Sequence, residues 1–307
     1  MSQLFSLRIP ASSANLGPGF DSFGLALQKY LTLYVERNNE WVFQHQSDHL
    51  SHLPTGEDHF IFQVAQQVAK RYERTLPPCR VMVESDIPLA RGLGSSASAV
   101  VAGVELANHL LQLNLSTKEK ISFGIHFEGH PDNISASLLG GFIINGFDGK
   151  EFDWVRIDQF DVDIVMIIPP YELKTELARS VLPRQFQREE ATKGSSIANL
   201  VLAALLQKDY EKAGDWMEKD LFHEPYRASL IHDFRIIRKQ AKYFGAFGTT
   251  ISGAGPTMIS IVPKGFGEHI QKKLSYHYPS FVIEKVGIEP KGVQVQFYSQ
   301  GRTENIV

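Results

Sequence analysis

Hydrophobic and polar residues follow two periodicities along this chain, one typical of helices and one typical of strands. Phe60, Val64 and Val68 belong to a set of apolar residues at helical spacing, which predicts a helix over residues 60–72 with these three side chains in the core. The pair Pro77-Pro78 predicts that this helix ends before it. Alternation or short apolar runs predict strands over residues 4–9, 31–36 and 81–87.

A loop of small residues, 88–98, follows the third of these strands, and a strongly apolar helix is predicted over residues 97–111. Gly140-Gly141-Phe142 and residues 145–149 have the composition of turns. We take the second turn as a domain boundary. The predicted domains are therefore residues 1–150 and 151–307.

The second half mixes both kinds of element. Apolar patterns predict strands over 162–168, 257–262, 281–286 and 293–298, and helices over 195–206, 210–221, 227–243 and 266–276. Strands and helices do not alternate regularly in either half, so we expect an α+β fold rather than a doubly wound parallel sheet.

Composition narrows the class of protein. The chain has 307 residues, of which 43% are hydrophobic and 21% charged, as in ordinary globular proteins of one large or two average domains. The formal net charge is −3. A basic surface along the whole chain is therefore excluded, and we expect no nucleic-acid partner.

The cysteine content and the first residues indicate the cellular compartment. The one cysteine, Cys79, excludes an internal disulfide and a cysteine-based zinc site, and we expect it to be a buried structural thiol. The first residues lack the pattern of a secretory signal, and no apolar run approaches the ~20 residues of a membrane span. We expect a cytoplasmic protein without a membrane partner.

Three loops combine glycine with other small residues: 10–21, 88–98 and 252–257. The middle loop joins a predicted strand to a predicted helix. Gly92 and Gly94 allow the backbone to approach a ligand closely, and Ser95, Ser96 and Ser98 would cap the helix and donate hydrogen bonds. Backbone N–H groups and the helix dipole then favour phosphate. The alternative is a plain strand-to-helix turn with a serine cap.

Common phosphate-binding and catalytic motifs are missing from the sequence. It contains no G-x-x-x-x-G-K-[ST], no G-x-G-x-x-G, no H-R-D or D-F-G and no G-x-S-x-G. P-loop NTPases, protein kinases and α/β-hydrolases are therefore excluded.

Taken in order, the three loops resemble the three motifs of the GHMP family of small-molecule kinases. Other segments resemble the branch of that family that acts on the amino acid homoserine, namely 10–21, 128–133, 175–183, 223–227 and 252–257. The family's ATP-binding loop corresponds to Pro88, Leu89, Ala90, Arg91, Gly92, Leu93, Gly94, Ser95, Ser96, Ala97 and Ser98.

The resemblance implies a fold and an activity. The fold is α+β with two domains, an N-terminal ribosomal-protein-like domain that holds ATP and a C-terminal ferredoxin-like domain. The activity is ATP-dependent phosphorylation of the L-homoserine hydroxyl in threonine biosynthesis, with ATP and Mg²⁺ as cofactors and a homodimer as the suggested assembly. Alternatives are a GHMP kinase for mevalonate, shikimate or a sugar, and a non-catalytic relative that only binds a ligand.

It also implies roles for single residues. Arg179 and Arg227 would bind the substrate carboxylate and Asp21 its ammonium. The other implied substrate contacts are Asn15, His130, Asn133 and Gly253. Without the resemblance, the arginines could equally lie on helix surfaces, and Asp21 could form an Asx turn or a helix cap.

The resemblance also implies positions for the metal ion and for the group that accepts the proton of the hydroxyl. Ser96 and Glu128 occupy the implied Mg²⁺ positions. Asp132, together with Asn133, occupies the implied catalytic position, where Asp132 would act as a general base. Stabilisation of the transition state without a base stays open as the alternative. His59 stands where the family often has asparagine near the adenine, so its contribution there is left open.

Overall fold

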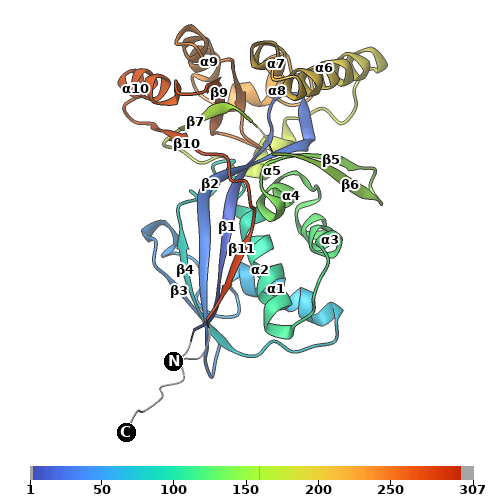
Figure 1. The fold of residues 1–307 in the computed structure, drawn as a ribbon, viewed down its shortest axis with the longest axis vertical. Coiled ribbons are helices and arrows are strands. Elements are labelled where there is room, and N and C mark those ends of the chain that lie inside the picture. The colour runs from blue at the N-terminus through green and yellow to red at the C-terminus, as the bar shows by residue number, and fades with distance from the viewer. Residues whose placement is uncertain (1–2, 159, 299–307) are drawn as a thin grey trace.

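The computed structural model describes residues 3–158 and 160–298, which form two sheets with helices packed on them (Figure 1). The larger sheet has seven strands in the order β11-β1-β2-β4-β3, with β5 on β2 and β6 on β5. These strands are β1 (Gln3–Asn15), β2 (Gly19–Arg37), β3 (Val42–His45), β4 (Cys79–Ser85), β5 (Phe142–Phe147), β6 (Phe152–Ile157) and β11 (Gln294–Phe297).

Four helices cover one face of this sheet in the lower half of Figure 1. They are α1 (Phe60–Arg71), α2 (Ser95–Leu111), α3 (Thr117–Glu128) and α4 (Asp132–Leu139), and a short 3₁₀ turn, Asp48–Leu50, follows β3. Helix α2 packs against α1, α3, α4 and β1, so most of its residues are buried. This explains why α2 is apolar on nearly all sides.

The second sheet is antiparallel and forms the other half of the molecule, with strand order β10-β7-β9-β8. Its strands are β7 (Val162–Ile168), β8 (Gly248–Ile251), β9 (Met258–Pro263) and β10 (Val282–Val286). The helices of this half are α5 (Thr175–Ser180), α6 (Arg188–Leu206), α7 (Tyr210–Met217), α8 (Glu224–Arg227), α9 (Phe234–Tyr243) and α10 (Gly267–His277). All seven residues of β7 are buried, including Asp163, as expected for an interior strand of the sheet.

The α+β prediction is confirmed, and two local predictions are wrong. The helix predicted over 227–243 is interrupted: α8 ends at Arg227, a 3₁₀ turn follows over Ala228–Leu230, and α9 begins at Phe234. The chain leaves helical geometry between them, with an extended Ile231 and a φ of +60° at Asp233. The turn predicted over 145–149 begins too early, since β5 continues through Phe147 in register with β6.

Helices α3, α4 and α5 were not predicted. Helix α3 buries only Ile121 and Gly124 completely, so its apolar periodicity is weak. Its start nevertheless has a signal, because Ser116 and Glu119 form a reciprocal capping box. Helices α4 and α5 have eight and six residues, too few for a clear period.

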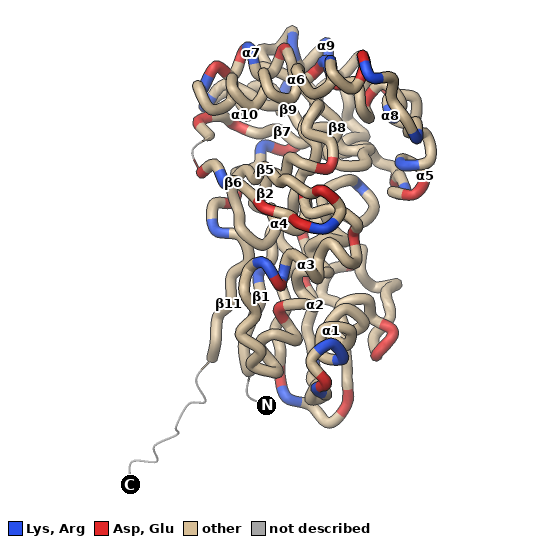
Figure 2. The backbone as a smooth tube through the Cα atoms, turned by 90° about the vertical axis from the view of Figure 1, so that its right-hand side faces the viewer, with Lys and Arg blue, Asp and Glu red and all other residues tan. Residues whose placement is uncertain are grey.

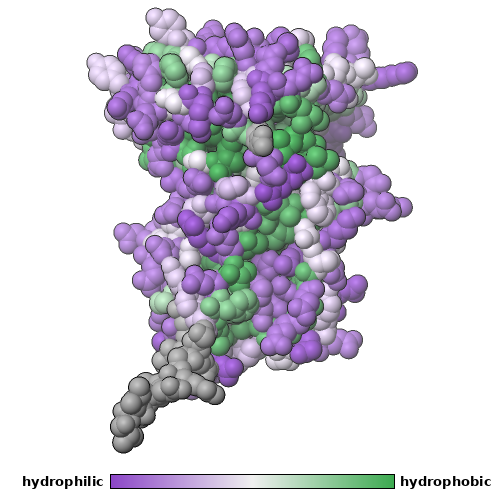
Figure 3. Space-filling view, in the orientation of Figure 1, coloured by the Kyte–Doolittle hydropathy of each residue, from purple (hydrophilic) through white to green (hydrophobic). Residues whose placement is uncertain are grey.

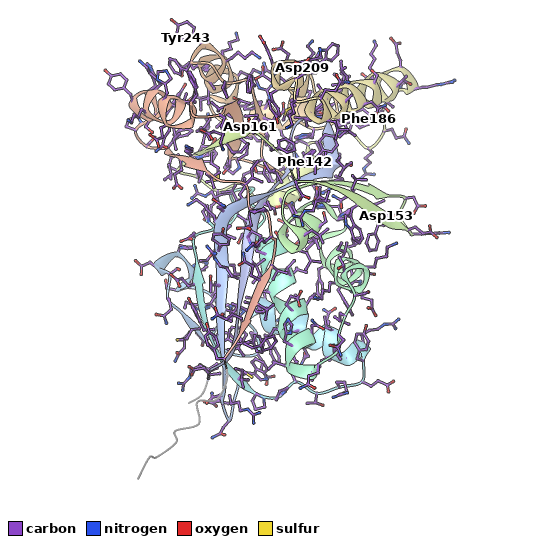
Figure 4. The ribbon with its side chains drawn as sticks, viewed as in Figure 1. Phe142, Asp153, Asp161, Phe186, Asp209 and Tyr243 are labelled. Atoms are coloured by element: carbon purple, nitrogen blue, oxygen red, sulfur yellow. The ribbon has the colours of Figure 1, made fainter. Side chains whose placement is uncertain are left out.

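The domain boundary expected near residue 150 lies in the turn of the β5–β6 hairpin, which projects from the middle of the molecule and carries Asp153 (Figure 4). The chain also returns to the first sheet near its end, where Phe297 of β11 pairs with Phe5 of β1. Figure 3 shows two lobes with a narrower middle between them. The division at residue 150 stays a prediction.

Cys79 is buried at the start of β4, and burial raises the pKa of its thiol to about 11. The thiol is therefore protonated at neutral pH and unreactive, as expected for a structural residue. Among the described residues, none of the helices has the length and apolar character needed to cross a bilayer.

Candidate active site

A cavity of about 520 Å³ lies where the three small-residue loops meet. One end is apolar, the middle is formed by the loop before α2, and the other end is charged. Residues of the apolar end include Leu31, Leu50, Leu53, Pro54, His59, Phe60, Ile61, Val83 and Ile87. Residues of the charged end include Asn15, Asp21, His130, Asp132, Asn133, Lys174, Glu176, Arg179 and Arg227.

The three loops are joined by direct hydrogen bonds. The Ser252 hydroxyl donates to Gly92 O at 2.6 Å and lies 2.8 Å from the Ser13 hydroxyl. The Gly253 N–H donates to Ala14 O at 3.0 Å. The third loop therefore packs against the first two. Segments more than 200 residues apart form a single wall of the cavity.

The middle of the cavity is built on the N-terminus of α2. Gly94 is the N-cap, with φ +68°, and no side chain caps the helix. The predicted serine cap is wrong, because Ser95 and Ser96 already belong to the first turn and the Ser98 hydroxyl donates to Pro10 O and Gly94 O. An N-terminus without a side-chain cap presents its N–H groups to a bound anion.

Eight of the eleven residues of the implied ATP loop line the cavity: Leu89, Ala90, Arg91, Gly92, Gly94, Ser95, Ser96 and Ala97. Leu93 and Ser98 are buried behind them, and Pro88 does not line the cavity. The Arg91 side chain donates to Pro169 O, and the Leu173 N–H donates to Ala90 O at 3.2 Å. These bonds tie the loop to the second half of the chain.

The charged end brings Asp21 and Arg179 into contact. Arg179 Nη2 lies 3.0 Å from Asp21 Oδ1, and both side chains are more than one third exposed. Asn15 holds the Asp21 backbone, because its Oδ1 accepts from Asp21 N–H at 3.0 Å while its Nδ2 donates to Gly253 O at 2.9 Å. Because this ion pair is open to solvent, the two charged groups of a zwitterion can replace it, with the ammonium on the Asp21 carboxylate and the carboxylate on the Arg179 guanidinium.

Arg227 is the largest fully buried side chain of the described residues, although it was expected at least as readily on a helix surface. Its Nε donates to Ala178 O at 3.1 Å and its Nη1 to Gly253 O at 2.9 Å. Burial lowers the pKa of Arg227 to about 10, which still leaves it charged at neutral pH. The Phe20 ring lies near this guanidinium and that of Arg179, at 5.4 and 5.8 Å.

His130 and Asp132 form a close pair beside Asp21. His130 Nδ1 lies 2.5 Å from Asp132 Oδ1, which also accepts from Asn133 N–H at 2.6 Å. Burial alone would lower the pKa of His130, but the Asp132 carboxylate outweighs it and the net pKa is raised. One ligand atom each from Asp21, His130 and Asp132 lies within 4.8 Å of the others, so this corner favours a cationic group.

Ser96 and Glu128 also meet, at the facing ends of α2 and α3. The Ser96 hydroxyl donates to Glu128 Oε1 at 2.5 Å. One hydroxyl and one carboxylate at the edge of a phosphate-binding loop match the small number of protein oxygens that Mg²⁺ takes beside nucleotide phosphates. The donor set therefore fits this ion.

His59 is the N-cap of α1 at the apolar end. Its Nδ1 accepts from Ile61 N–H at 3.2 Å, and its ring stacks on Phe43 with centroids 4.0 Å apart. Burial lowers the pKa of His59 to about 4, so the imidazole is neutral at neutral pH. The core prediction holds for Val64 and Val68 but is wrong for Phe60, which is 41% exposed and lines the cavity.

Sequence reasoning missed three residues that line the charged end, Lys174, Thr175 and Glu176. They lie at the start of α5, next to or within the segment 175–183 that resembles the family, and that position was the available signal. Acidic and basic residues are interspersed on the side of the molecule that Figure 2 shows. The charge at the cavity is therefore local.

Comparisons with known proteins agree with one another. Residues 59–141 match the model of the GHMP kinases N terminal domain, and residues 201–280 match that of the GHMP kinases C terminal domain. A homoserine kinase of Halalkalibacterium halodurans is 47% identical over 95% of this chain and 94% of its own. One of Oceanobacillus iheyensis is 49% identical over 95% of this chain and 99% of its own.

Solved structures show the same likeness. The homoserine kinase of Cytophaga hutchinsonii superposes with a TM-score of 0.82 at 25% identity, covering 96% of this chain and 98% of its own. The mevalonate kinase of L. major superposes with a TM-score of 0.68 at 17% identity, covering 94% and 95%, which shows a common fold alone.

Proposed function

This chain belongs to the homoserine kinase branch of the GHMP kinases, and we propose that it transfers the γ-phosphoryl group of ATP to the hydroxyl of L-homoserine. The product is O-phospho-L-homoserine, an intermediate of threonine biosynthesis. The observation that carries the proposal is one cavity that joins an apolar end, a helix N-terminus without a side-chain cap and a charged end.

The charged end has the groups that an amino acid requires. The α-carboxylate would bind Arg227 and Arg179, and the ammonium would bind Asp21, displacing the Asp21–Arg179 pair. Asn15 and Gly253 support this corner through their mutual hydrogen bond. His130 and Asn133 would contact the substrate from the loop before α4 and its first turn.

ATP would lie in the apolar end and the middle of the cavity. The adenine would occupy the apolar end near His59 and Phe60, and the phosphates would bind the backbone N–H groups of residues 92–96. Ser96 and Glu128 would hold Mg²⁺, which supplies charge neutralisation for the β- and γ-phosphates. Phosphate binding then requires no basic surface, which agrees with the net charge of −3.

Phosphoryl transfer requires the hydroxyl to be aligned with the γ-phosphate and relieved of its proton. Asp132 lines the cavity at its charged end and would accept that proton. Its Oδ1 already accepts from His130 and the Asn133 N–H, so the carboxylate is held in one orientation. Stabilisation of the transition state without a base remains the competing mechanism.

Two other functions compete with this one. Kinases of mevalonate or of sugars share the fold, but their substrates lack the ammonium and carboxylate pair that Asp21 and the two arginines suit. A protein that only binds a ligand would have no use for Ser96 and Glu128 in contact beside the phosphate loop. The suggested homodimer rests on the family resemblance, and the cytoplasmic setting stays an expectation from the sequence.

A coupled assay of ADP release tests the proposal. The protein, ATP and Mg²⁺ are combined in turn with L-homoserine, mevalonate, shikimate and galactose, and a calorimetric titration with ATP is run alongside. We expect ADP release with L-homoserine and little with the others. ATP binding without ADP release for any acceptor would support the binding-only alternative, and a preference for another acceptor would replace homoserine.

A further inference from the structure

The side chain of His223 lies behind the charged end of the cavity and is fully buried. Its Nδ1 is 3.2 Å from Nη1 of Arg227, and its Nε2 is 2.9 Å from the carbonyl oxygen of Gly17 in the first loop. A guanidinium can only donate, so Nδ1 must accept and Nε2–H must donate to Gly17. A single neutral tautomer satisfies both contacts.

Its surroundings hold this imidazole in place. The Asp220 carboxylate accepts from three consecutive backbone N–H groups, those of Phe222, His223 and Glu224, at 2.7 to 2.9 Å. The Phe20 ring stacks on the imidazole with centroids 5.5 Å apart. Burial lowers the pKa of His223 to about 4, which keeps the acceptor lone pair on Nδ1 available at neutral pH.

The other contacts of Arg227 leave one group free for a ligand. Nε and Nη1 have backbone acceptors in Ala178 and Gly253, whereas Nη2 has no hydrogen-bond partner within the described part of the chain. Arg227 lines the cavity. The His223 contact adds a third, side-chain constraint to the two backbone acceptors, and together they fix the guanidinium plane and so the direction of Nη2.

We propose that His223 is a positioning residue, which orients Arg227 toward the carboxylate of the amino-acid substrate and ties that orientation to the first loop through Gly17. The inference rests on the proposed function, since it assigns a carboxylate to Arg227. A merely structural histidine would support the fold without affecting recognition of the carboxylate.

Two conservative variants separate the two hydrogen bonds. An asparagine amide oxygen takes roughly the place of Nδ1, so His223→Asn keeps the acceptor for Arg227. A glutamine amide nitrogen takes roughly the place of Nε2, so His223→Gln keeps the donor to Gly17 and leaves Arg227 without its acceptor. His269→Gln, on the exposed face of α10, is the matched control.

The readouts are the KM for L-homoserine, the KM for ATP, and the inhibition constant of 3-aminopropan-1-ol, which lacks the carboxylate. Loss of a hydrogen bond to a charged group predicts that His223→Gln raises the homoserine KM about tenfold to a hundredfold. We expect the ATP KM and the aminopropanol constant to change by less than about threefold. His223→Asn keeps the acceptor but loses the tie to Gly17, so it should raise the homoserine KM by a smaller factor than His223→Gln does. His269→Gln should stay near the parent in all three.

The proposal is overturned if His223→Gln weakens homoserine and 3-aminopropan-1-ol by the same factor, or if the homoserine KM does not change. Failure of both variants to unfold cooperatively would assign His223 to the fold and would equally overturn it. The proposed function fails separately, when the unmodified protein releases no ADP with L-homoserine.

Discussion

Gly92 is the point where the phosphate loop and the third loop touch, and replacing it with alanine tests whether that contact matters. Gly92 has φ +73°, a region that L side chains rarely adopt. A Cβ there would lie 2.3 Å from Ser252 O and 2.8 Å from Gly255 O, both backbone atoms that cannot rotate away. The left-handed conformation costs about 1–2 kcal/mol and the forced separation about 1–3 kcal/mol.

Gly92→Ala should therefore lower the free energy of unfolding by roughly 2–5 kcal/mol, which corresponds to a drop in Tm of about 3–8 °C for a chain of this length. Moving the loop by as little as about 1 Å should also raise the ATP KM at least about tenfold, because binding depends on the alignment of several N–H groups. Scanning calorimetry measures the first effect, and ADP-release kinetics at saturating homoserine measure the second.

Gly149→Ala is the matched control. Gly149 has φ +93°, but a Cβ there would meet nothing within 4 Å, so the variant carries the backbone strain without the collision. We expect it to lose about 1–2 kcal/mol with an unchanged ATP KM. Equal losses of Tm in both variants would show that the contact between the loops does not contribute to the free energy of unfolding. An unchanged ATP KM in Gly92→Ala would remove the loop from the nucleotide site.

Three further predictions concern single side chains of the cavity. Asp132→Asn should lower kcat at least about a hundredfold while the homoserine KM stays within about twofold, and turnover within twofold of the parent would exclude a general base. Glu128→Gln should raise the Mg²⁺ concentration for half-maximal activity about tenfold or more, and an unchanged Mg²⁺ dependence would place the ion elsewhere. Because burial lowers the pKa of His59 to about 4, lowering the pH from 7 to 5 protonates this group mainly in the unfolded state and should cost about 2 kcal/mol of stability. His59→Asn retains a capping acceptor but has no titrating group, so its free energy of unfolding should fall by about 2 kcal/mol less between pH 7 and pH 5 than that of the parent. Urea titrations at the two pH values measure this difference, and an identical pH dependence would contradict the assignment.

Local patterns account for what the sequence predicted well. The helix over 60–72 and the strand over 162–168 have periods and runs that depend on neighbours within a few residues, and they appear as α1 and β7. The fold class followed from the irregular mixture of such elements.

The ends of helices were less predictable. The first turn of α2 has a glycine N-cap where serines suggested a side-chain cap, because Ser98 bonds instead to Pro10, 88 residues away.

The candidate site shows the same division. Residue types and their order were enough to select the three loops and most of the charged residues of the cavity, though not Lys174 and Glu176. They could not determine which arginine would be buried. Arg179 and Arg227 look alike in sequence, yet one is paired with Asp21 at the surface and the other is enclosed by Ala178, Gly253 and His223.

By itself, the sequence determined the α+β class, the family and the chemistry available at each loop, because those depend on residue type and short spacing. Only the tertiary structure decided how the loops join, how His59 and His223 become neutral, and which N–H groups and carboxylates face one cavity. The physical reason is that hydrogen bonds such as Gly253 to Ala14, and the loss of solvent around a buried imidazole, arise between segments far apart in the chain. Local spacing carries no information about such contacts.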